Sequence, residues 1–352
     1  MLRRRVIFWV LGLSLLFGAP YFLSSYDLSL LGRFLALSLV TIGIVWSWGY
    51  TGILSLGQGV FFGLGAYALA MHLKLAELPP GELPDFMIWN GVSNLPWWWL
   101  PFRNPFFAFA MVIILPGILA LLLSFLLFRR RITGVYVSLI TQALALAFST
   151  LLISQQGLTG GFNGLTNFTT LLGFYLWSDQ FQRGLYWFTV AFVVGILCFS
   201  FWLRSTHLGK LLVAIRDGEN RVRFLGYDPT PYKVFAFTLS GVLAGIGGAL
   251  FVLYAGVISP AMVGVVPSIE MVVWAAVGGR ESLFGALLGT VLGNLIKDRV
   301  SSAFPDIWLY LVGFLFILVV FRPSGSFLGY FQRLTLRQRS KKKEEVFGDV
   351  SP

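Results

Sequence analysis

Long runs of apolar residues, separated by short stretches that contain charges, glycine or proline, make up most of this chain. A helix needs about 20 mainly apolar residues to cross a bilayer. The runs therefore predict an all-α fold, a polytopic bundle of about ten transmembrane helices, of which the eighth and ninth are short. The predicted spans are 6–24, 34–49, 53–73, 105–128, 133–153, 185–203, 232–257, 269–279, 283–296 and 307–321.

The composition agrees with this pattern and excludes a soluble fold. Of the 352 residues, 57% are hydrophobic and only 12% are charged, and the mean hydropathy is +0.80. Ordinary soluble domains contain about 25% charged residues. A membrane β-barrel is excluded as well, because its strands alternate in hydropathy over about ten residues and contain no apolar runs of this length.

The distribution of charge along the chain explains the net charge of +11. If the N-terminus, with Arg3 to Arg5, is cytoplasmic, 20 of the 26 Lys and Arg residues fall in cytoplasmic segments, whereas the acidic residues divide almost evenly. This is the positive-inside pattern of a membrane protein, and it predicts two cytoplasmic termini and no nucleic-acid partner. The first apolar run continues past residues 17–19, which favours a retained span over a cleaved signal peptide.

The predicted organisation is one transmembrane domain, residues 1–323, followed by a tail, residues 324–352. The tail is basic and rich in Lys and Glu without an apolar period, so we expect it to be cytoplasmic and disordered. Two segments between spans are long. We expect residues 74–104 to form an outer loop that rests at the level of the lipid headgroups, and residues 204–231 to lie on the cytoplasmic side.

The sequence offers little for catalytic chemistry. A single cysteine, Cys198, excludes an intrachain disulfide, and His72 and His207 lie far apart in the sequence. Neither a His/Cys metal cluster nor a Ser-His-Asp hydrolase is expected. We therefore assign no catalytic residue, metal site or cofactor to this chain, and expect that it is not an enzyme.

Polar side chains within or beside the apolar runs are candidates for a solute pathway, because such groups are costly in hydrocarbon. Each has a structural alternative: an interhelical hydrogen bond for the two glutamines, and a simple turn for the loop after the fifth span. An amide carries both a C=O acceptor and NH₂ donors, so it can match a small polar solute. The candidates are Gln58, Thr141, Gln142, Asn163 and Glu270.

Glycines spaced four residues apart recur in the spans and indicate close helix packing. Gly59 and Gly63 lie in the third span, where a locally broken helix that faces a cavity is the alternative. Gly285 and Gly289 lie in the ninth span, where we expect packing alone.

The segment 204–231 is too polar to insert into the bilayer and contains two short helical stretches, one before Gly218 and one that ends near Gly226. Such an amphipathic helix pair suits docking to another protein, and lying on the inner leaflet is the alternative. The residues expected to make the contact are Ala214, Arg216, Asp217, Gly218 and Gly226.

Taken together, these motifs resemble the permeases of the branched-chain amino acid family of ABC importers, over residues 40 to 323. The segment from Arg216 to Gly226 resembles the coupling loop of such permeases. Within the family the chain resembles the urea transporter permease subunit most. The motifs that carry the resemblance are residues 52–59, 65–67, 209–228 and 278–285 for the family, and residues 82–87, 95–97, 140–144 and 161–166 for the urea branch.

The resemblance implies a heteromeric importer in the bacterial inner membrane. Its parts would be this chain, a related permease subunit, two ATPase subunits that bind the ATP, and a periplasmic substrate-binding protein, all in contact with membrane lipid. Transport would proceed by alternating access, with ATP-driven closure acting on the 209–228 loop.

Urea is the expected solute, because it is neutral and the predicted spans contain no buried cation–anion pair to hold a zwitterion. A branched-chain or other hydrophobic amino acid is the alternative. A passive urea or ammonia channel is a further alternative, but it would not explain the cytoplasmic helix pair.

Overall fold

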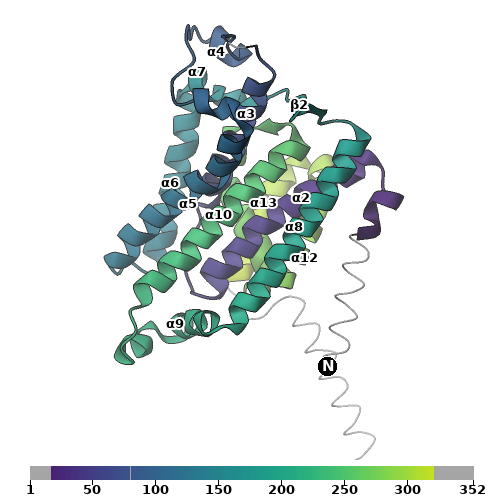
Figure 1. The fold of residues 1–352 in the computed structure, drawn as a ribbon. Coiled ribbons are helices and arrows are strands. Elements are labelled where there is room, and N and C mark those ends of the chain that lie inside the picture. The colour runs from purple at the N-terminus through teal and green to yellow at the C-terminus, as the bar shows by residue number, and fades with distance from the viewer. Residues whose placement is uncertain (1–16, 80, 321–352) are drawn as a thin grey trace, which may run out of the picture.

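The computed structural model describes residues 17–79 and 81–320, which form a bundle of long helices (Figure 1). We call the two ends of the bundle the α4 end and the α9 end, after the helices that lie at the top and bottom of Figure 1. The α-helices are α2 (Ser25–Ile44), α3 (Gln58–Ala76), α4 (Asp85–Trp89), α5 (Pro105–Arg129), α6 (Val135–Ser154), α7 (Gln156–Thr159), α8 (Asp179–Ser205), α9 (His207–Phe224), α10 (Pro229–Ala255), α11 (Val265–Gly278), α12 (Leu283–Ala303) and α13 (Pro305–Val320).

Short elements connect these helices. Two small antiparallel sheets pair β1 with β4 and β2 with β3, so that the loop after α7 is joined to the loop after α10. A π-helix, η1, extends α2 by one turn. The bounds are η1 (Val45–Gly49), the 3₁₀ helices η2 (Leu100–Arg103), η3 (Gly161–Asn163) and η4 (Pro260–Met262), and the strands β1 (Leu165–Thr166), β2 (Thr170–Leu171), β3 (Phe174–Tyr175) and β4 (Val257–Ile258).

Side-chain caps fix where several long helices begin. Ser178 Oγ accepts a hydrogen bond from Phe181 N at the start of α8, and Ser282 Oγ accepts one from Gly285 N at the start of α12. Asn104 caps α5 in the same way and is followed by Pro105 at the first helical position. These caps satisfy backbone N–H groups that a helix leaves without partners at its first turn.

Seven helical stretches among the described residues are long and apolar enough to cross a membrane, judged by length and composition. They comprise α2 with η1, α3, α5, α6, α8, α10, and α11 with η4. The first predicted span and the tail lie mostly or wholly outside the described residues. Neither α12, which carries three charges near its end, nor the shorter α13 is among the seven, so the count of ten spans and the location of the termini stay predictions.

The helices follow the predicted apolar runs but differ at several boundaries. Helix α5 begins where predicted, whereas α2 begins at Ser25 instead of residue 34 and α12 continues to Ala303 instead of residue 296. Residues 50–57, predicted to lie partly in the third span, are not helical. The two extensions matter because they move charged residues from predicted loops onto helices.

Helix α10 lies at the centre of the bundle, packed against α2, α3 and α5. The approach to α3 is backbone to backbone: a Cβ added to Gly65 would overlap the carbonyl of Gly245, and one added to Gly248 would overlap the carbonyl of Phe62. The glycines of the predicted seams make similar contacts, Gly59 with Val263, Gly63 with Val263, Gly285 with Gly278, and Gly289 with Trp274 and Gly278.

We expect Gly65→Ala to lower the free energy of unfolding by about 1–3 kcal/mol, because the new methyl group must push α3 away from α10. The matched control is Gly195→Ala on α8, where nothing lies within 4 Å of an added Cβ. That change should be neutral or slightly stabilising. Chemical or thermal unfolding in detergent measures both variants, and equal stability of the two would contradict the tight crossing.

Candidate functional site

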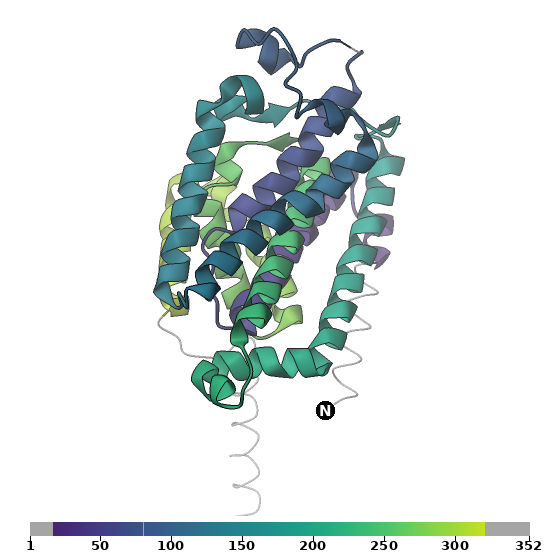
Figure 2. The same ribbon diagram turned by 60° about the vertical axis from the view of Figure 1, so that its left-hand side comes forward.

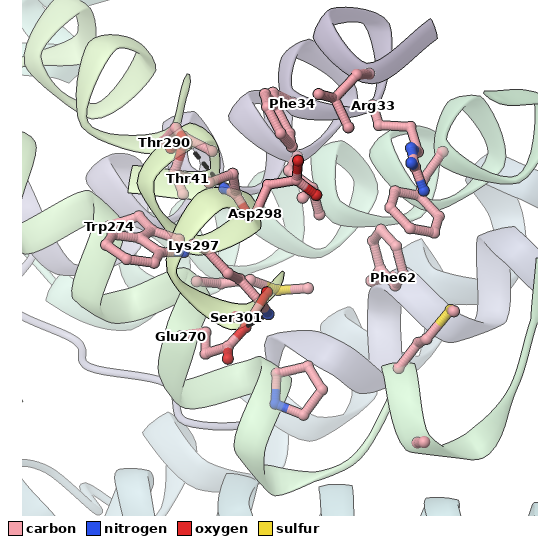
Figure 3. Close-up of a pocket in the computed structure, with 18 residues that line it drawn as sticks. Arg33, Phe34, Thr41, Phe62, Glu270, Trp274, Thr290, Lys297, Asp298 and Ser301 are labelled. Carbon is pink, nitrogen blue, oxygen red and sulfur yellow. Dashed lines mark hydrogen bonds and ion pairs between the residues drawn. The ribbon is translucent and has the colours of Figure 1, made fainter. Parts of the chain in front are cut away.

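A cavity of about 320 Å³ lies between α2, α11 and α12 (Figure 3). Its volume is at the lower end of the range for small-molecule sites, about 300–1,000 Å³. Apolar side chains from five helices form much of the wall, among them Phe34, Phe62, Phe251, Met271 and Trp274. Charged side chains also reach it, so the lining combines an apolar surface with a few polar groups.

Two of these charges face the cavity without a partner. Arg33 extends from α2 and Asp298 from α12, and Figure 3 shows both side chains directed into the same space. The Nε of Arg33 is buried and donates to no partner among the described residues, and none of those residues forms an ion pair with Asp298. Charges within a helix bundle of this kind are costly unless they are paired or serve a ligand. The cavity therefore holds one cationic and one anionic group that are both available.

A second pair of charges in the cavity is already satisfied. Lys297 on α12 forms an ion pair with Glu270 on α11, and Trp308 Nε1 donates a hydrogen bond of 3.1 Å to the other Glu270 oxygen. The Lys297 ammonium also lies 5.7 Å from the centre of the Trp308 ring. The sequence predicted no buried cation–anion pair in the spans, and the structure adds this partly buried pair because α12 extends far enough to bring Lys297 to Glu270.

A hydrogen bond between α2 and α12 closes the cavity on one side. Thr41 Oγ1 and Thr290 Oγ1 are 2.7 Å apart and both residues are buried. One turn further along α12, Asn294 Nδ2 donates to Thr290 O at 2.8 Å. The bond between Thr41 and Thr290 therefore joins the two helices that carry Arg33 and Asp298, and the Asn294 bond lies within α12.

The other predicted pathway residues lie elsewhere, apart from Glu270. Gln58 is fully buried and donates from Nε2 to Ser240 Oγ at 3.0 Å, which joins α3 to α10, while its Oε1 has no partner. Thr141 is also fully buried and accepts from Leu56 N at 3.1 Å. Gln142 is half-buried and Asn163 is exposed.

Helix α9 lies across one end of the bundle (Figure 2) and consists of two helical pieces. The break is at Gly218, where φ is −175° and ψ is 75°. Gly226 follows the second piece in the left-handed region, with a φ of 88°, which suits a glycine after a helix end. The predicted helix pair is thus confirmed, and its residues Ala214 and Asp217 are exposed.

Arg216 connects α9 to two other parts of the chain. Its Nη1 donates to Gly49 O at 2.7 Å, at the end of η1, and lies 3.1 Å from a carboxylate oxygen of Glu281, just before α12. Its Nε binds Asp217 at 2.8 Å. Burial lowers the pKa of Arg216, but the interactions with Asp217 and Glu281 outweigh it, so the pKa lies above its ordinary value and the group stays charged.

Glu219 anchors α9 to α10. Its carboxylate accepts from Lys233 Nζ at 2.6 Å and from Arg223 Nη2 at 2.9 Å, and Lys233 is buried. Burial raises the pKa of Glu219, but the hydrogen bonds from Lys233 and Arg223 bring it below its ordinary value. The ionised carboxylate is therefore the form that holds the two helices together.

Sequence reasoning missed Arg33, Lys297 and Asp298 as site residues, because it assigned them to loops on the outer side. A signal was present: Arg33 stands between Leu30-Leu31-Gly32 and Phe34-Leu35, where an apolar pattern continues on both sides of one charge. No pattern in the sequence pointed to the contact between Arg216 and Glu281.

The fold and these contacts define a helical membrane protein with a small-molecule cavity at one place and a polar, surface helix pair at another. Residues 27–320 match the family described as branched-chain amino acid transport system / permease component. The chain belongs to this family, whose members are transporter permease subunits and not enzymes.

Curated relatives are similar over most of the chain. The high-affinity branched-chain amino acid transport system permease protein LivM of Salmonella typhimurium is 26% identical over 321 residues, which cover 85% of this chain and 69% of the relative. The probable branched-chain amino acid permease LivM of Methanocaldococcus jannaschii is 24% identical over 82% of this chain and 89% of the relative. The L-arabinose permease AraH of Azospirillum brasilense is 26% identical over 37% of this chain and 40% of the relative. No solved structure matches the chain at a significant level.

The comparisons do not support urea as the solute. The family and the relatives that match over most of the chain are described by branched-chain amino acid transport. The alternative drawn from the sequence, an amino acid permease, therefore fits better than the urea prediction.

We expect Glu219→Gln to lower the free energy of unfolding at pH 7 by about 2 kcal/mol, because it leaves the buried Lys233 ammonium without its carboxylate. The pKa of Glu219 is lowered by folding, so its stabilisation is present above the unfolded pKa of about 4.3 and is lost as the pH falls through the folded pKa. Unfolding measured at several pH values should show the difference from the native protein shrinking below about pH 4. Glu82→Gln, at an exposed position, is the control and should have no effect at any pH.

Proposed function

We propose that this chain is the permease subunit of an ATP-driven importer for branched-chain or other hydrophobic amino acids in the bacterial inner membrane. The observation that carries the proposal is a pair of charges, Arg33 and Asp298, that face a cavity with an apolar wall and have no ion-pair partner within residues 17–79 and 81–320. A free amino acid carries a carboxylate and an ammonium near neutral pH. Urea is neutral and would leave both half-buried charges without a counter-charge.

The chemistry of each group suggests its role. Arg33 presents a planar guanidinium that can bind a carboxylate through two parallel hydrogen bonds. Asp298 can accept hydrogen bonds from an ammonium group. An aliphatic side chain would then lie against Phe62, Phe251 and Met271. Glu270 would not bind the solute directly, since its carboxylate already binds Lys297 and Trp308. The other predicted pathway residues stay candidates for other steps of transport, namely Gln58, Thr141, Gln142 and Asn163.

The relatives support the same solute class, because the LivM proteins of Salmonella typhimurium, Escherichia coli and Methanocaldococcus jannaschii are described as branched-chain amino acid permeases. As a permease of this kind, the chain would act with a related permease subunit, two ATPase subunits that bind the ATP, and a periplasmic substrate-binding protein. The cations at the α9 end, Arg129 to Arg131 and those between Arg204 and Lys233, favour a cytoplasmic location for that end.

The proposed route of coupling runs through Arg216. This side chain contacts the end of the segment that continues α2, at Gly49, and the residue Glu281 that precedes α12. Helices α2 and α12 carry Arg33 and Asp298 near their other ends. A push of an ATPase subunit on the exposed Ala214 and Asp217 would therefore reach both helices that hold the substrate.

We expect Arg33→Gln and Asp298→Asn each to raise the KM for leucine uptake by about 10- to 100-fold, because each removes the charge-assisted hydrogen bonding to one end of the zwitterion. The measurement is ATP-dependent uptake of labelled leucine, with urea as a competitor, in vesicles that contain the assembled importer. Arg299→Gln, an exposed neighbour on α12, is the control and should transport normally. Native KM values in both cavity variants, or inhibition of leucine uptake by urea, would contradict the amino acid assignment.

We expect Arg216→Gln to lower leucine uptake at least tenfold while ATP hydrolysis by the assembled importer continues, because the contacts with Gly49 and Glu281 are lost. Arg216→Lys, which keeps the charge but lacks the fork of donors, should recover only part of the activity. Arg221→Gln is the control, since Arg221 is exposed on the same helix. Copurification of the subunits checks assembly, and normal uptake per ATP hydrolysed in Arg216→Gln would contradict this route.

A further inference from the structure

A second cavity, of about 690 Å³, lies between α5 and α10 towards the α9 end and is separate from the substrate cavity. Its walls come from Leu121 and Phe125 on α5 and from Val234, Phe235, Thr238 and Val242 on α10. Leu121, Phe125 and Phe235 are exposed, so the cavity is a groove on the outer surface of the bundle. Both helices are long and apolar enough to span a membrane, and this surface would therefore face the bilayer or another subunit.

The groove has the length of one lipid chain. Its lining on α10 runs from Thr230 to Val242, which at 1.5 Å per residue is about 18 Å along the helix. One leaflet of a bilayer contributes about half of the ~30 Å hydrocarbon core. An extended acyl chain of the leaflet at the α9 end would thus fit along the groove.

A cluster of cations stands at the open end of the groove. Arg129, Arg130 and Arg131 end α5 and are all exposed, and the Arg129 guanidinium lies 5.4 Å from the centre of the Phe125 ring in the groove wall. None of the three has a carboxylate ion-pair partner among the described residues. Basic clusters beside transmembrane helices on the cytoplasmic side attract anionic lipid headgroups.

One anion also stands at this end and must be considered. Asp228 lines the groove, but its carboxylate is engaged by Thr230 N at 3.0 Å as the cap of α10 and by Arg223 at 3.9 Å. The charge of Arg131 also acts on this carboxylate. Three arginines therefore stand beside a single acid that Arg223 already contacts, which leaves the rim with an excess of positive charge.

We propose that the groove between α5 and α10 binds an anionic phospholipid, with an acyl chain along Val234, Thr238 and Val242 and the phosphate at Arg129 and Arg131. The proposal does not depend on which solute is transported. It commits to a lipid and not to a partner helix, because a basic rim above an apolar groove matches the two ends of a phospholipid. A lipid held in this place would fix the spacing of α5 and α10 beside the α9 contact surface.

The test is lipid binding to the purified full chain, with the subunits that copurify with it, measured by native mass spectrometry. Phosphatidylglycerol and phosphatidylcholine with identical acyl chains are added separately in neutral detergent. We expect phosphatidylglycerol to bind more tightly by roughly 30-fold, from two arginines near the headgroup. Arg129→Gln with Arg131→Gln should remove that preference. The control, Lys210→Gln with Arg221→Gln, removes the same charge from exposed positions on α9 and should keep it.

A second variant separates the groove from the charge. Val242→Trp fills the groove without altering the arginines and should weaken binding of both lipids at this site, whereas Leu295→Trp, at an exposed position on α12, should not. Equal binding of the two lipids by the native chain would overturn the proposal. An equal loss of the phosphatidylglycerol preference in the Lys210/Arg221 control would also overturn it, because that result indicates attraction by net charge alone. Crosslinking of the groove residues to a partner subunit, with no lipid retained, would overturn it as well.

Discussion

Backbone contact between α3 and α10 is the constraint on which the arrangement of the other helices depends. Hydrocarbon does not drive apolar helices together as water does, so association relies on close packing and hydrogen bonds. Gly65 against Gly245 and Gly248 against Phe62 supply that packing, and the bond from Gln58 to Ser240 joins the same two helices. With α10 fixed in this way, α2 and α5 pack on its remaining sides and the cavity beside α2 is formed.

The charges within the described part of the bundle divide into satisfied and unsatisfied groups, and the proposed substrate site rests on this division. Lys297 has Glu270, and Glu219 has both Lys233 and Arg223, so these charges are explained by structure alone. Arg33 has a buried Nε without a partner. An unpaired cation at such a position is costly, and a ligand with the opposite charge removes that cost.

Much of the fold follows from the apolar pattern, whereas the site depends on contacts that the pattern does not contain. The break of α9 at Gly218 and the bounds of α5 agree with the predictions from local sequence. The predicted second span begins just after Arg33 and the predicted ninth span ends just before Lys297, because an isolated charge in hydrocarbon is unfavourable and normally ends a span. Here both helices continue past the charge, since the cavity and Glu270 provide surroundings that only the folded chain creates. The π-helix after α2 likewise has no signal in its sequence.

The same two helices connect the cavity to the surface at the α9 end. From Arg33 to Gly49 the chain rises by about 24 Å along α2 and its π-helical continuation. Midway, Thr41 holds α2 to Thr290 of α12, and at the far end Arg216 holds Gly49 together with Glu281. In the proposed coupling, a displacement of α9 would act on α2 and α12 at one end and would change the relative position of Arg33 and Asp298 further along the same helices. π-Helical turns often occur at functional sites, and this one ends where Arg216 of α9 contacts the segment that continues α2.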